Sequence, residues 1–298
     1  RGAPGLLGAV GLVLLSVWVG RGSVTTAEEE ALVVAIVQPN VEQAIKWDPD
    51  FQARTMAVYR ALTLEAARAG PAVVIWPETM VPGFYRDGEF CFDLRLADFA
   101  RARKQEILVG VAYWKSSDDG KSLLQYNSAL RIDVEGKERE RYSKRHLVPG
   151  GEYVPMGALF PILQGGIQAM TGLSMPPDLK PGEAPLVMNL AGWPTGIPIC
   201  YEVIFPEISR EFVNQGARLL INMTNEGWFK ESAEFEQILP TAQFRAIENR
   251  VGMLRAANTG ISCSITPHGA IYAALEKDGK RKNFSGILTT DVFLGDGR

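Results

Sequence analysis

The stretch from Gly192 to Glu207 contains the residue best placed for covalent chemistry, Cys200. Residues 194–199 predict a short buried strand bounded by turn-forming residues, and Cys200 lies where this strand ends. Pro206 and Glu207 predict the first turn of a helix, because proline is tolerated there and a carboxylate suits the positive end of the helix dipole. A thiol at such a turn suits a nucleophile with a lowered pKa and backbone N–H groups nearby for an oxyanion. The alternative is a buried cysteine that acts as a small apolar side chain.

Two further side chains could act with this thiol. Glu78 follows a buried strand predicted over residues 72–76, where α/β folds gather functional side chains, and its carboxylate could take the thiol proton. Lys144 would share one face with Tyr142 and His146 if that segment is a strand. Its ammonium could stabilise a thiolate and later the negative oxygen of a tetrahedral intermediate. Taken alone, each of the two charged residues also fits a solvated surface position.

The remaining titratable residues and the net charge limit which kinds of site and partner the chain can have. Glu152 lies in a glycine-rich turn, and Glu202 lies two residues after the thiol. Cys91 and Cys263 have no comparable partners nearby in the sequence, so we expect them to pack as apolar residues. Three widely spaced cysteines and two histidines form neither a disulfide framework nor a zinc-ligand pattern. A net charge of -3 over 298 residues gives no reason to expect a nucleic-acid partner.

Composition divides the chain into three predicted parts. Residues 3–20 carry no charge and are long enough to cross a bilayer, which predicts a transmembrane helix over residues 1–22. The core of a signal peptide is the alternative. The first residue is arginine, so we expect the chain to be part of a longer protein. Residues 23–30 form a polar linker, and residues 31–298 have the composition of a globular domain.

Within residues 31–298 strands and helices alternate, which indicates an α/β fold with a largely buried sheet. The predicted strands are 31–38, 72–76, 107–114, 125–134, 194–199, 218–223, 252–257, 262–266 and 286–292. The predicted helices are 51–69, 94–104, 204–215 and 234–250. Residues 155–175 are uncharged and interrupted by glycines and prolines, which predicts an apolar lid over the site, with ordinary core packing as the alternative.

Three segments at predicted strand ends resemble the motifs of the carbon–nitrogen hydrolase (nitrilase) superfamily. They read WPET at Trp76–Thr79, YSKRHLVPGGE at Tyr142–Glu152 and PICYEVIFPE at Pro198–Glu207. This resemblance runs over residues 31–292 and implies a nitrilase-like four-layer α-β-β-α sandwich. Within the superfamily the sequence is most similar to the apolipoprotein N-acyltransferase family. That similarity rests on the preceding apolar segment, VQPN followed by Lys46–Trp47, KRHLVPGGEYVP, and NEGWF at residues 225–229.

The resemblance assigns a role to each candidate and requires no metal or organic cofactor. It implies that Cys200 is the nucleophile, Glu78 the general base and Lys144 the group that stabilises the oxyanion. It also implies supporting residues and substrate-binding residues, which are Glu152, Tyr201 and Glu202 for the first group and Trp47 and Trp228 for the second.

The reaction implied is a two-step acyl transfer. A fatty acyl chain moves from a phospholipid to the cysteine as a thioester, and then to the N-terminal amine of a diacylglyceryl-modified apolipoprotein. The resemblance further implies the bacterial inner membrane, a catalytic domain on its periplasmic side and additional membrane helices flanking this region. Two other functions fit the same residues. One is an amidase with the same Glu–Lys–Cys triad, and the other is a catalytically silent binding domain tethered to the membrane.

Overall fold

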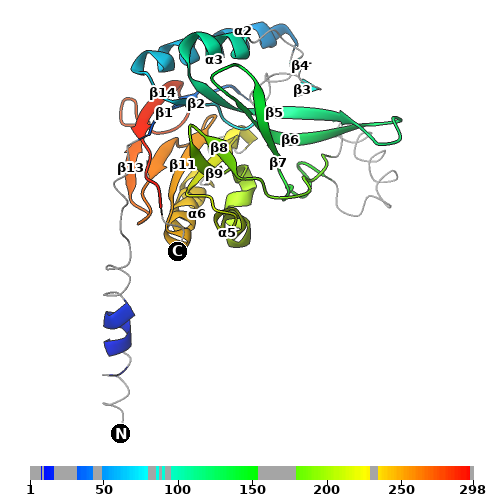
Figure 1. Cartoon of the computed structure of the whole chain (residues 1–298). Helices are drawn as coiled ribbons and strands as arrows, with labels where there is room; N and C mark the ends of the chain where they lie inside the picture. The colour runs from blue at the N-terminus through cyan, green and yellow to red at the C-terminus, as the bar shows by residue number, and fades with distance from the viewer. Residues whose placement is uncertain are drawn as a thin grey trace, which may run out of the picture.

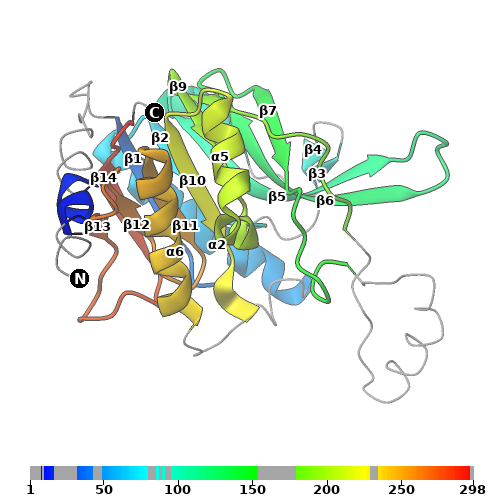
Figure 2. The ribbon, with the colours of Figure 1, turned by 90° about the horizontal axis from the view of Figure 1, so that it is seen from below.

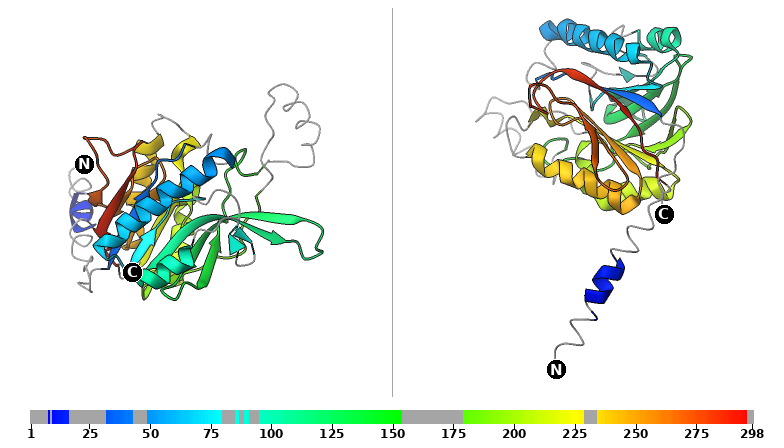
Figure 3. Two further views of the ribbon diagram at one scale, coloured as in Figure 1. Left: turned by 90° about the horizontal axis from the view of Figure 1, so that it is seen from above. Right: turned by 90° about the vertical axis from the view of Figure 1, so that its left-hand side faces the viewer.

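Two mixed β-sheets pack face to face in this protein, and helices cover both outer surfaces (Figures 1 and 3). The computed structural model describes residues 8, 10–16, 32–42, 49–79, 85–86, 89–90, 95–153, 179–228 and 234–295. The first sheet contains β1 (Val33–Gln38), β2 (Val73–Ile75), β3 (Tyr85–Arg86), β4 (Glu89–Phe90), β5 (Glu106–Ser116), β6 (Leu123–Ile132), β7 (Glu138–Ser143) and β14 (Gly286–Asp291). The second contains β8 (Met188–Leu190), β9 (Trp193–Gly196), β10 (Leu219–Thr224), β11 (Gly252–Ala257), β12 (Cys263–Ile265) and β13 (Ile271–Ala274).

In the part of the chain that the structure describes, four longer helices and three short 3-10 helices connect these strands. The longer ones are α2 (Pro49–Ala66), α3 (Leu96–Arg103), α5 (Pro206–Asn214) and α6 (Glu234–Asn249). The short ones are η1 (Ala67–Ala69), η2 (Cys200–Ile204) and η3 (Glu226–Trp228). Helices α2 and α3 cover the first sheet in Figure 1, and α5 and α6 lie across the second sheet in Figure 2. The layers therefore follow the α-β-β-α order that the family resemblance implies.

Parallel strands form the centre of each sheet. In the first sheet β1 pairs with β2 and β2 with β5 in parallel, and β14 and β6 flank them in antiparallel pairing. In the second sheet β9, β10 and β11 are parallel, and β8 and β12 flank them. Parallel strands bring their carboxyl ends to one edge of a sheet. The candidate residues follow β2 and β9, at such edges.

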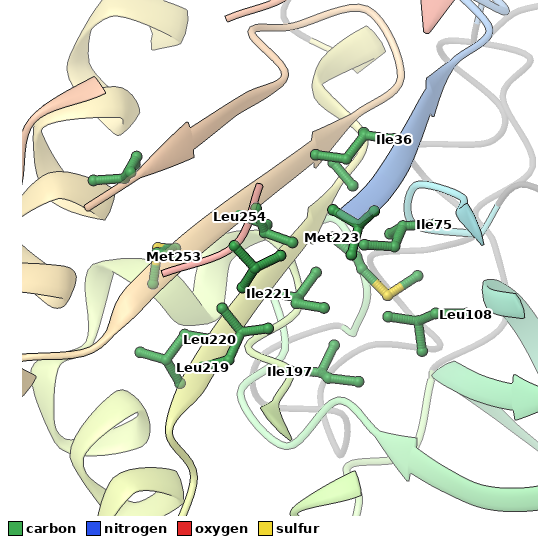
Figure 4. Packing of buried hydrophobic residues seen from close by; sticks show 14 of the residues in the cluster. Ile36, Ile75, Leu108, Ile197, Leu219, Leu220, Ile221, Met223, Met253 and Leu254 are labelled. Atoms are coloured by element: carbon green, nitrogen blue, oxygen red, sulfur yellow. The ribbon is translucent and has the colours of Figure 1, made fainter. Parts of the chain in front are cut away.

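Aliphatic side chains fill the space between the two sheets (Figure 4). The side chains at the centre of this core are at most 1% exposed. They include Ile36, Ile75, Leu108, Ile197, Ile221, Met223 and Leu254. Burying one such side chain stabilises a fold by about 1.5–3 kcal/mol relative to leaving it in water. This shared core holds the two sheets, and therefore their strand ends, in one fixed relation.

A second core lies between the first sheet and helices α2 and α3. Along β1, Ala35 and Val37 belong to this outer core while Ile36 belongs to the central one, so both faces of the strand are buried. Tyr59 of α2 stacks on Trp76 with ring centroids 4.6 Å apart. The fixed indole lies two residues before Glu78, so this stacking anchors the turn that carries the carboxylate.

The structure corrects several predicted boundaries. The face that Lys144 and His146 would share in a strand is not formed, because β7 ends at Ser143, and beyond it Lys144 is buried while His146 is exposed. The strand predicted over 194–199 covers Trp193–Gly196 and continues only as a single bridge between Ile199 and Met223. The predicted helix start at Pro206 is confirmed, although η2 precedes it.

Two sequence predictions concern segments that the structure describes only in part or not at all. Residues 8 and 10–16 are helical, but among the described residues no helix is both long and apolar enough to span a bilayer. The transmembrane helix predicted over residues 1–22 is therefore not confirmed. The lid predicted over residues 155–175 lies outside the described residues, as does Cys91.

Candidate active site

Glu78 lies in the turn after β2 and is held from both sheets. Its side chain is buried, and Oε1 accepts a hydrogen bond of 2.6 Å from Asn127 Nδ2 of β6. Oε2 accepts a hydrogen bond of 2.8 Å from the main-chain N–H of Asn225, directly after β10 in the second sheet. The carboxylate therefore bridges the edges at which the parallel strands of the two sheets end.

Lys144 follows β7 and faces two carboxylates. Its Nζ lies 3.6 Å from Glu78 Oε1 and 2.9 Å from Glu152 Oε2, and its side chain is only 1% exposed. Burial alone would lower the pKa of this ammonium, but the negative charges of Glu78, Cys200 and Glu152 outweigh burial and raise the pKa. Lys144 therefore stays charged in a site that excludes water.

Asn127 connects the two carboxylates and was not identified from the sequence. Its Nδ2 donates to Glu78 and also to Glu152 Oε1 at 3.0 Å, so each amide hydrogen has a carboxylate partner. Its main-chain carbonyl accepts a 2.8 Å hydrogen bond from the N–H of Lys144. Glu152 Oε2 accepts a further bond of 2.8 Å from the Val148 N–H. Asn127 lies among other polar residues of the strand predicted over 125–134, so its sequence context did not single it out.

Cys200 opens η2 with a strained backbone. Its φ of 49° lies in the left-handed region, which costs a residue other than glycine on the order of 1–3 kcal/mol. Asn222 of β10 supports the turn, because its Nδ2 donates to the carbonyls of Pro198 at 3.0 Å and of Cys200 at 3.3 Å. Strained residues of this kind persist where the surrounding structure fixes them, as it does here.

The protonation state of Cys200 differs from the sequence prediction. Burial raises the pKa of the Cys200 thiol to about 12, the charge of Glu78 adds to the rise, and the ammonium of Lys144 opposes it. The predicted lowering of this pKa is therefore wrong, because protein encloses the sulfur although the residue as a whole is partly exposed, and the turn opens only a short 3-10 helix. A thiol in this state is neutral at physiological pH and needs a base to take its proton when it reacts.

Glu202 is a third buried carboxylate, and it joins the lysine segment to the cysteine turn. Its Oε1 accepts hydrogen bonds from the Tyr142 hydroxyl at 2.8 Å and from the N–H groups of Arg145 and His146 at 2.7 and 3.1 Å. Its Oε2 accepts a bond of 2.8 Å from the Ile199 N–H. Burial raises the pKa of Glu202, although these four hydrogen bonds act to lower it.

The other predicted site residues are placed only in part. Tyr201 is half-buried, and its ring packs edge-on against Phe205 with centroids 5.1 Å apart. Trp47 lies outside the described residues, and Trp228 ends η3 with a side chain that is not described. Cys263 is buried in β12, as expected for a packing residue.

Two glycines that were not singled out in the sequence allow neighbouring backbone to approach the segments of Glu78 and Lys144. A Cβ at Gly110 of β5 would overlap the main chain of Glu78 and of both its neighbours. A Cβ at Gly182 would overlap the carbonyl of Ser143, and the Gly182 N–H donates to the Lys144 carbonyl at 2.9 Å. These close approaches bring both segments tightly against neighbouring backbone.

A neutral thiol, a buried carboxylate and a charged ammonium together have the composition needed for covalent acyl chemistry. The carboxylate can take the thiol proton, and the ammonium can stabilise the oxygen that becomes negative in a tetrahedral intermediate. Within the part of the chain that the structure describes, no group of three or more His, Cys, Asp or Glu residues could hold a metal ion.

Among known protein families, the family model for carbon–nitrogen hydrolases matches residues 33–296 of this chain. The chain is 39% identical over 266 residues to a curated apolipoprotein N-acyltransferase of Geobacter metallireducens, covering 89% of this chain and 48% of that relative. It is 38% identical over 282 residues to the apolipoprotein N-acyltransferase of Azotobacter vinelandii, covering 92% and 52%. The chain therefore spans about half the length of these relatives.

Solved structures show the same fold at lower sequence identity. An amidase from Nesterenkonia sp. superposes with a TM-score of 0.60 at 20% identity, covering 88% of this chain and 90% of the amidase. At this identity the likeness establishes the shared fold and nothing about substrates.

Proposed function

The chain belongs to the carbon–nitrogen hydrolase family, and from this premise we propose that it is the catalytic domain of a phospholipid–apolipoprotein N-acyltransferase. The observation that carries the proposal is that the buried ammonium of Lys144 faces Glu78 and Glu152 and lies within electrostatic reach of the Cys200 thiol. The names of the curated relatives support N-acyl transfer to an apolipoprotein, and the family resemblance implies the phospholipid donor.

In the first half-reaction Cys200 Sγ attacks the carbonyl carbon of a phospholipid ester. Glu78 takes the thiol proton as the carbon–sulfur bond forms, and Lys144 stabilises the negative carbonyl oxygen. The ester C–O bond then breaks, and Glu78 returns the proton to the departing alcohol oxygen. The products are a thioester on Cys200 and a lysophospholipid.

In the second half-reaction the N-terminal amine of a diacylglyceryl-modified apolipoprotein attacks the thioester. Glu78 accepts a proton from the amine, the carbon–sulfur bond breaks, and the sulfur of Cys200 regains a proton. The product is an amide, and the protein returns to its starting state. Because Lys144 interacts electrostatically with Cys200, its positive charge stabilises the departing sulfur as well as the oxyanion.

The proposed donor is a membrane lipid, so the reaction is proposed to occur at the bacterial inner membrane. The uncharged residues 3–20 support attachment there, and the resemblance places the domain on the periplasmic side.

Mass spectrometry of the 298-residue chain tests this function. After incubation with phospholipid vesicles, we expect a mass increase of one acyl group on the peptide that contains Cys200. Cys200→Ala should abolish the adduct, while Cys263→Ser, which changes another buried thiol, should retain it. A synthetic diacylglyceryl-cysteine peptide should then remove the adduct and gain an N-acyl group. Hydrolysis of small amides without any adduct from phospholipid would instead favour the amidase alternative.

A further inference from the structure

A second buried ion pair lies close to the candidate site, between Glu226 of η3 and Arg255 of β11. The two residues are 1% and 0% exposed. Arg255 Nη2 donates to Glu226 Oε1, and Arg255 Nη1 donates to the carbonyl of Ile261 at 3.1 Å. Among the residues that the structure describes, Glu226 Oε2 and Arg255 Nε lack a hydrogen-bond partner. Desolvation offsets most of the attraction in such a pair, so its contribution to stability does not explain its presence.

The pair is connected to Glu78 through one residue. Glu226 directly follows Asn225, whose main-chain N–H donates to Glu78 Oε2 at 2.8 Å. The side chain of Asn225 is held as well, because its Oδ1 accepts a 2.9 Å hydrogen bond from Asn258 Nδ2. Asn258 directly follows β11, the strand that carries Arg255. Strand β11 and the residue that follows it therefore hold the turn after β10 at two points, the side chains of Asn225 and Glu226, next to the N–H group that reaches Glu78.

We propose that Glu226 and Arg255 are positioning residues, which fix the Asn225 N–H on Glu78 and so hold that carboxylate ready to take the Cys200 proton. The inference rests on the proposed role of Glu78 as the base, but it does not depend on which acyl donor is used. Because the hydrogen bond from Asn225 comes from the main chain, its direction is set by the turn rather than by a rotatable side chain. A misplacement of about 1 Å in such an arrangement can cost on the order of 100-fold in rate.

Charge balance decides which variant tests the proposal. The thiol of Cys200 is subject to the charges of Glu78, Lys144 and Glu152. Arg255 also lies within electrostatic reach of Cys200. Burial lowers the pKa of Arg255, and the negative charges of Cys263 and Cys200, when these thiols are ionised, oppose that lowering. Removing Glu226 alone would leave an unbalanced cation that favours the thiolate and hides the loss of positioning. The double variant Glu226→Leu/Arg255→Met removes both charges together and avoids this conflict.

Alkylation of Cys200 by iodoacetamide measures the effect without any acyl donor. The full 298-residue chain is alkylated between pH 6 and pH 10, and the peptide that contains Cys200 is quantified by mass spectrometry. We expect the double variant to react about 10- to 100-fold more slowly near neutral pH. The deficit should shrink as the pH rises, because a thiol that ionises by itself no longer needs a positioned base. Glu78→Gln sets the full size of the deficit.

Two further variants keep the test decisive. Glu138→Leu/Arg141→Met removes a half-buried ion pair of β7 with an N–O distance of 2.9 Å, and it should alkylate at the normal rate. Arg255→Lys keeps the charge but loses the planar fork, so it should show a smaller deficit with the same pH dependence even if the double variant folds poorly. Normal alkylation rates at every pH in both Arg255→Lys and Glu226→Leu/Arg255→Met would overturn the proposal. A deficit that is equal at every pH and follows a lowered melting temperature would also overturn it. Because iodoacetamide replaces the phospholipid, failure of the acyl-transfer proposal is a separate outcome.

Discussion

Two buried carboxylates of the candidate site, Glu202 and Glu78, have different hydrogen-bond partners. Glu202 accepts hydrogen bonds from one hydroxyl and three main-chain N–H groups, all of which belong to the segments that it joins. Glu78 accepts one bond from an amide side chain and one from a main-chain N–H, and it faces the ammonium of Lys144 at 3.6 Å. The first carboxylate has the environment of a structural link, and the second has that of a group that exchanges a proton.

The comparison shows that burial alone does not mark a functional carboxylate. Both side chains are buried, but only the surroundings of Glu78 combine a cation with donors from both sheets. Main-chain donors around Glu202 fix a geometry and cannot respond to a change of charge. A nearby ammonium can stabilise the negative charge that moves between thiol, carboxylate and substrate. The predictions below test this division of roles.

The largest effect is expected from Glu78→Gln, which keeps the shape of the side chain but removes the base. Acylation per folded molecule should slow by about 10²- to 10⁴-fold. The free energy of unfolding should fall by only about 1–3 kcal/mol, because the new NH₂ group faces the donor of Asn127 or Asn225 while Lys144 retains Glu152 as a partner. Single-turnover acylation and urea unfolding measure the two quantities. Lys144→Met should reduce acylation on a similar scale through loss of the oxyanion donor. Acylation at the normal rate in either variant would show that its role is wrongly assigned.

Glu202→Gln should show the opposite pattern, with a larger effect on stability than on chemistry. Its new NH₂ group would face N–H donors from Arg145, His146 or Ile199, so at least one buried donor loses its acceptor. We expect the free energy of unfolding to fall by about 1–3 kcal/mol. The rate of acylation per folded molecule should fall much less than in Glu78→Gln. A variant with unchanged stability and a rate as low as that of Glu78→Gln would remove the distinction between the two carboxylates.

Much of the fold could be predicted because its long elements carry their own pattern. Strand β11 lies over the predicted residues 252–257, and helix α6 ends within one residue of its predicted boundary. Strands β8 and β13 were missed because both are short. Buried and exposed positions alternate in β8, and β13 has no fully buried position. Such strands depend on pairing with their neighbours rather than on an apolar pattern in their own sequence.

The site was predictable to the extent that its residues follow strand ends. Glu78 and Cys200 both follow strands whose carboxyl ends meet, which made them candidates before their spacing was known. Asn127 and the Glu226–Arg255 pair could not be found in this way, because their partners are set by which strands lie side by side. The predicted direction of the Cys200 pKa shift was also wrong. Burial sets this shift, and burial depends on how the two sheets enclose the turn, which the sequence around Cys200 does not show.

Replacing Asn127 should sharpen the contrast from the side of the donors to Glu78. Asn127→Leu removes the amide that both Glu78 and Glu152 share, and we expect acylation to slow by about tenfold as the carboxylates lose a common donor. Asn127→Asp adds a third carboxylate around one ammonium. The acidic limb of the acylation pH profile should therefore move to higher pH, because crowded carboxylates retain protons.

A neighbouring position on the same strand provides the control for Asn127. Ser128→Ala removes the 2.8 Å hydrogen bond between Ser128 and Ser143 of β7. It should lower the free energy of unfolding by about 1 kcal/mol without changing the pH profile. If Asn127→Asp and Ser128→Ala gave the same profile, the amide would have no particular connection to the carboxylates.

The smallest effect concerns the thiol itself and appears only in alkali. Folding raises the pKa of Cys200 from 9.0 to about 12, so the folded state retains a proton that the unfolded chain releases. The stability from this proton is complete below pH 9 and is lost as the pH rises toward 12. Urea unfolding at about pH 8, 9 and 10 should therefore show a steeper loss in the protein with Cys200 than in Cys200→Ala, by up to about 1.4 kcal/mol per pH unit. Both proteins should carry Cys263→Ala, because burial also raises the pKa of that thiol to about 11. Parallel curves would mean that folding does not raise the pKa of Cys200. A shallower loss than in Cys200→Ala would mean that Cys200 is already ionised beside Lys144, in which case Glu78 would have no thiol proton to accept.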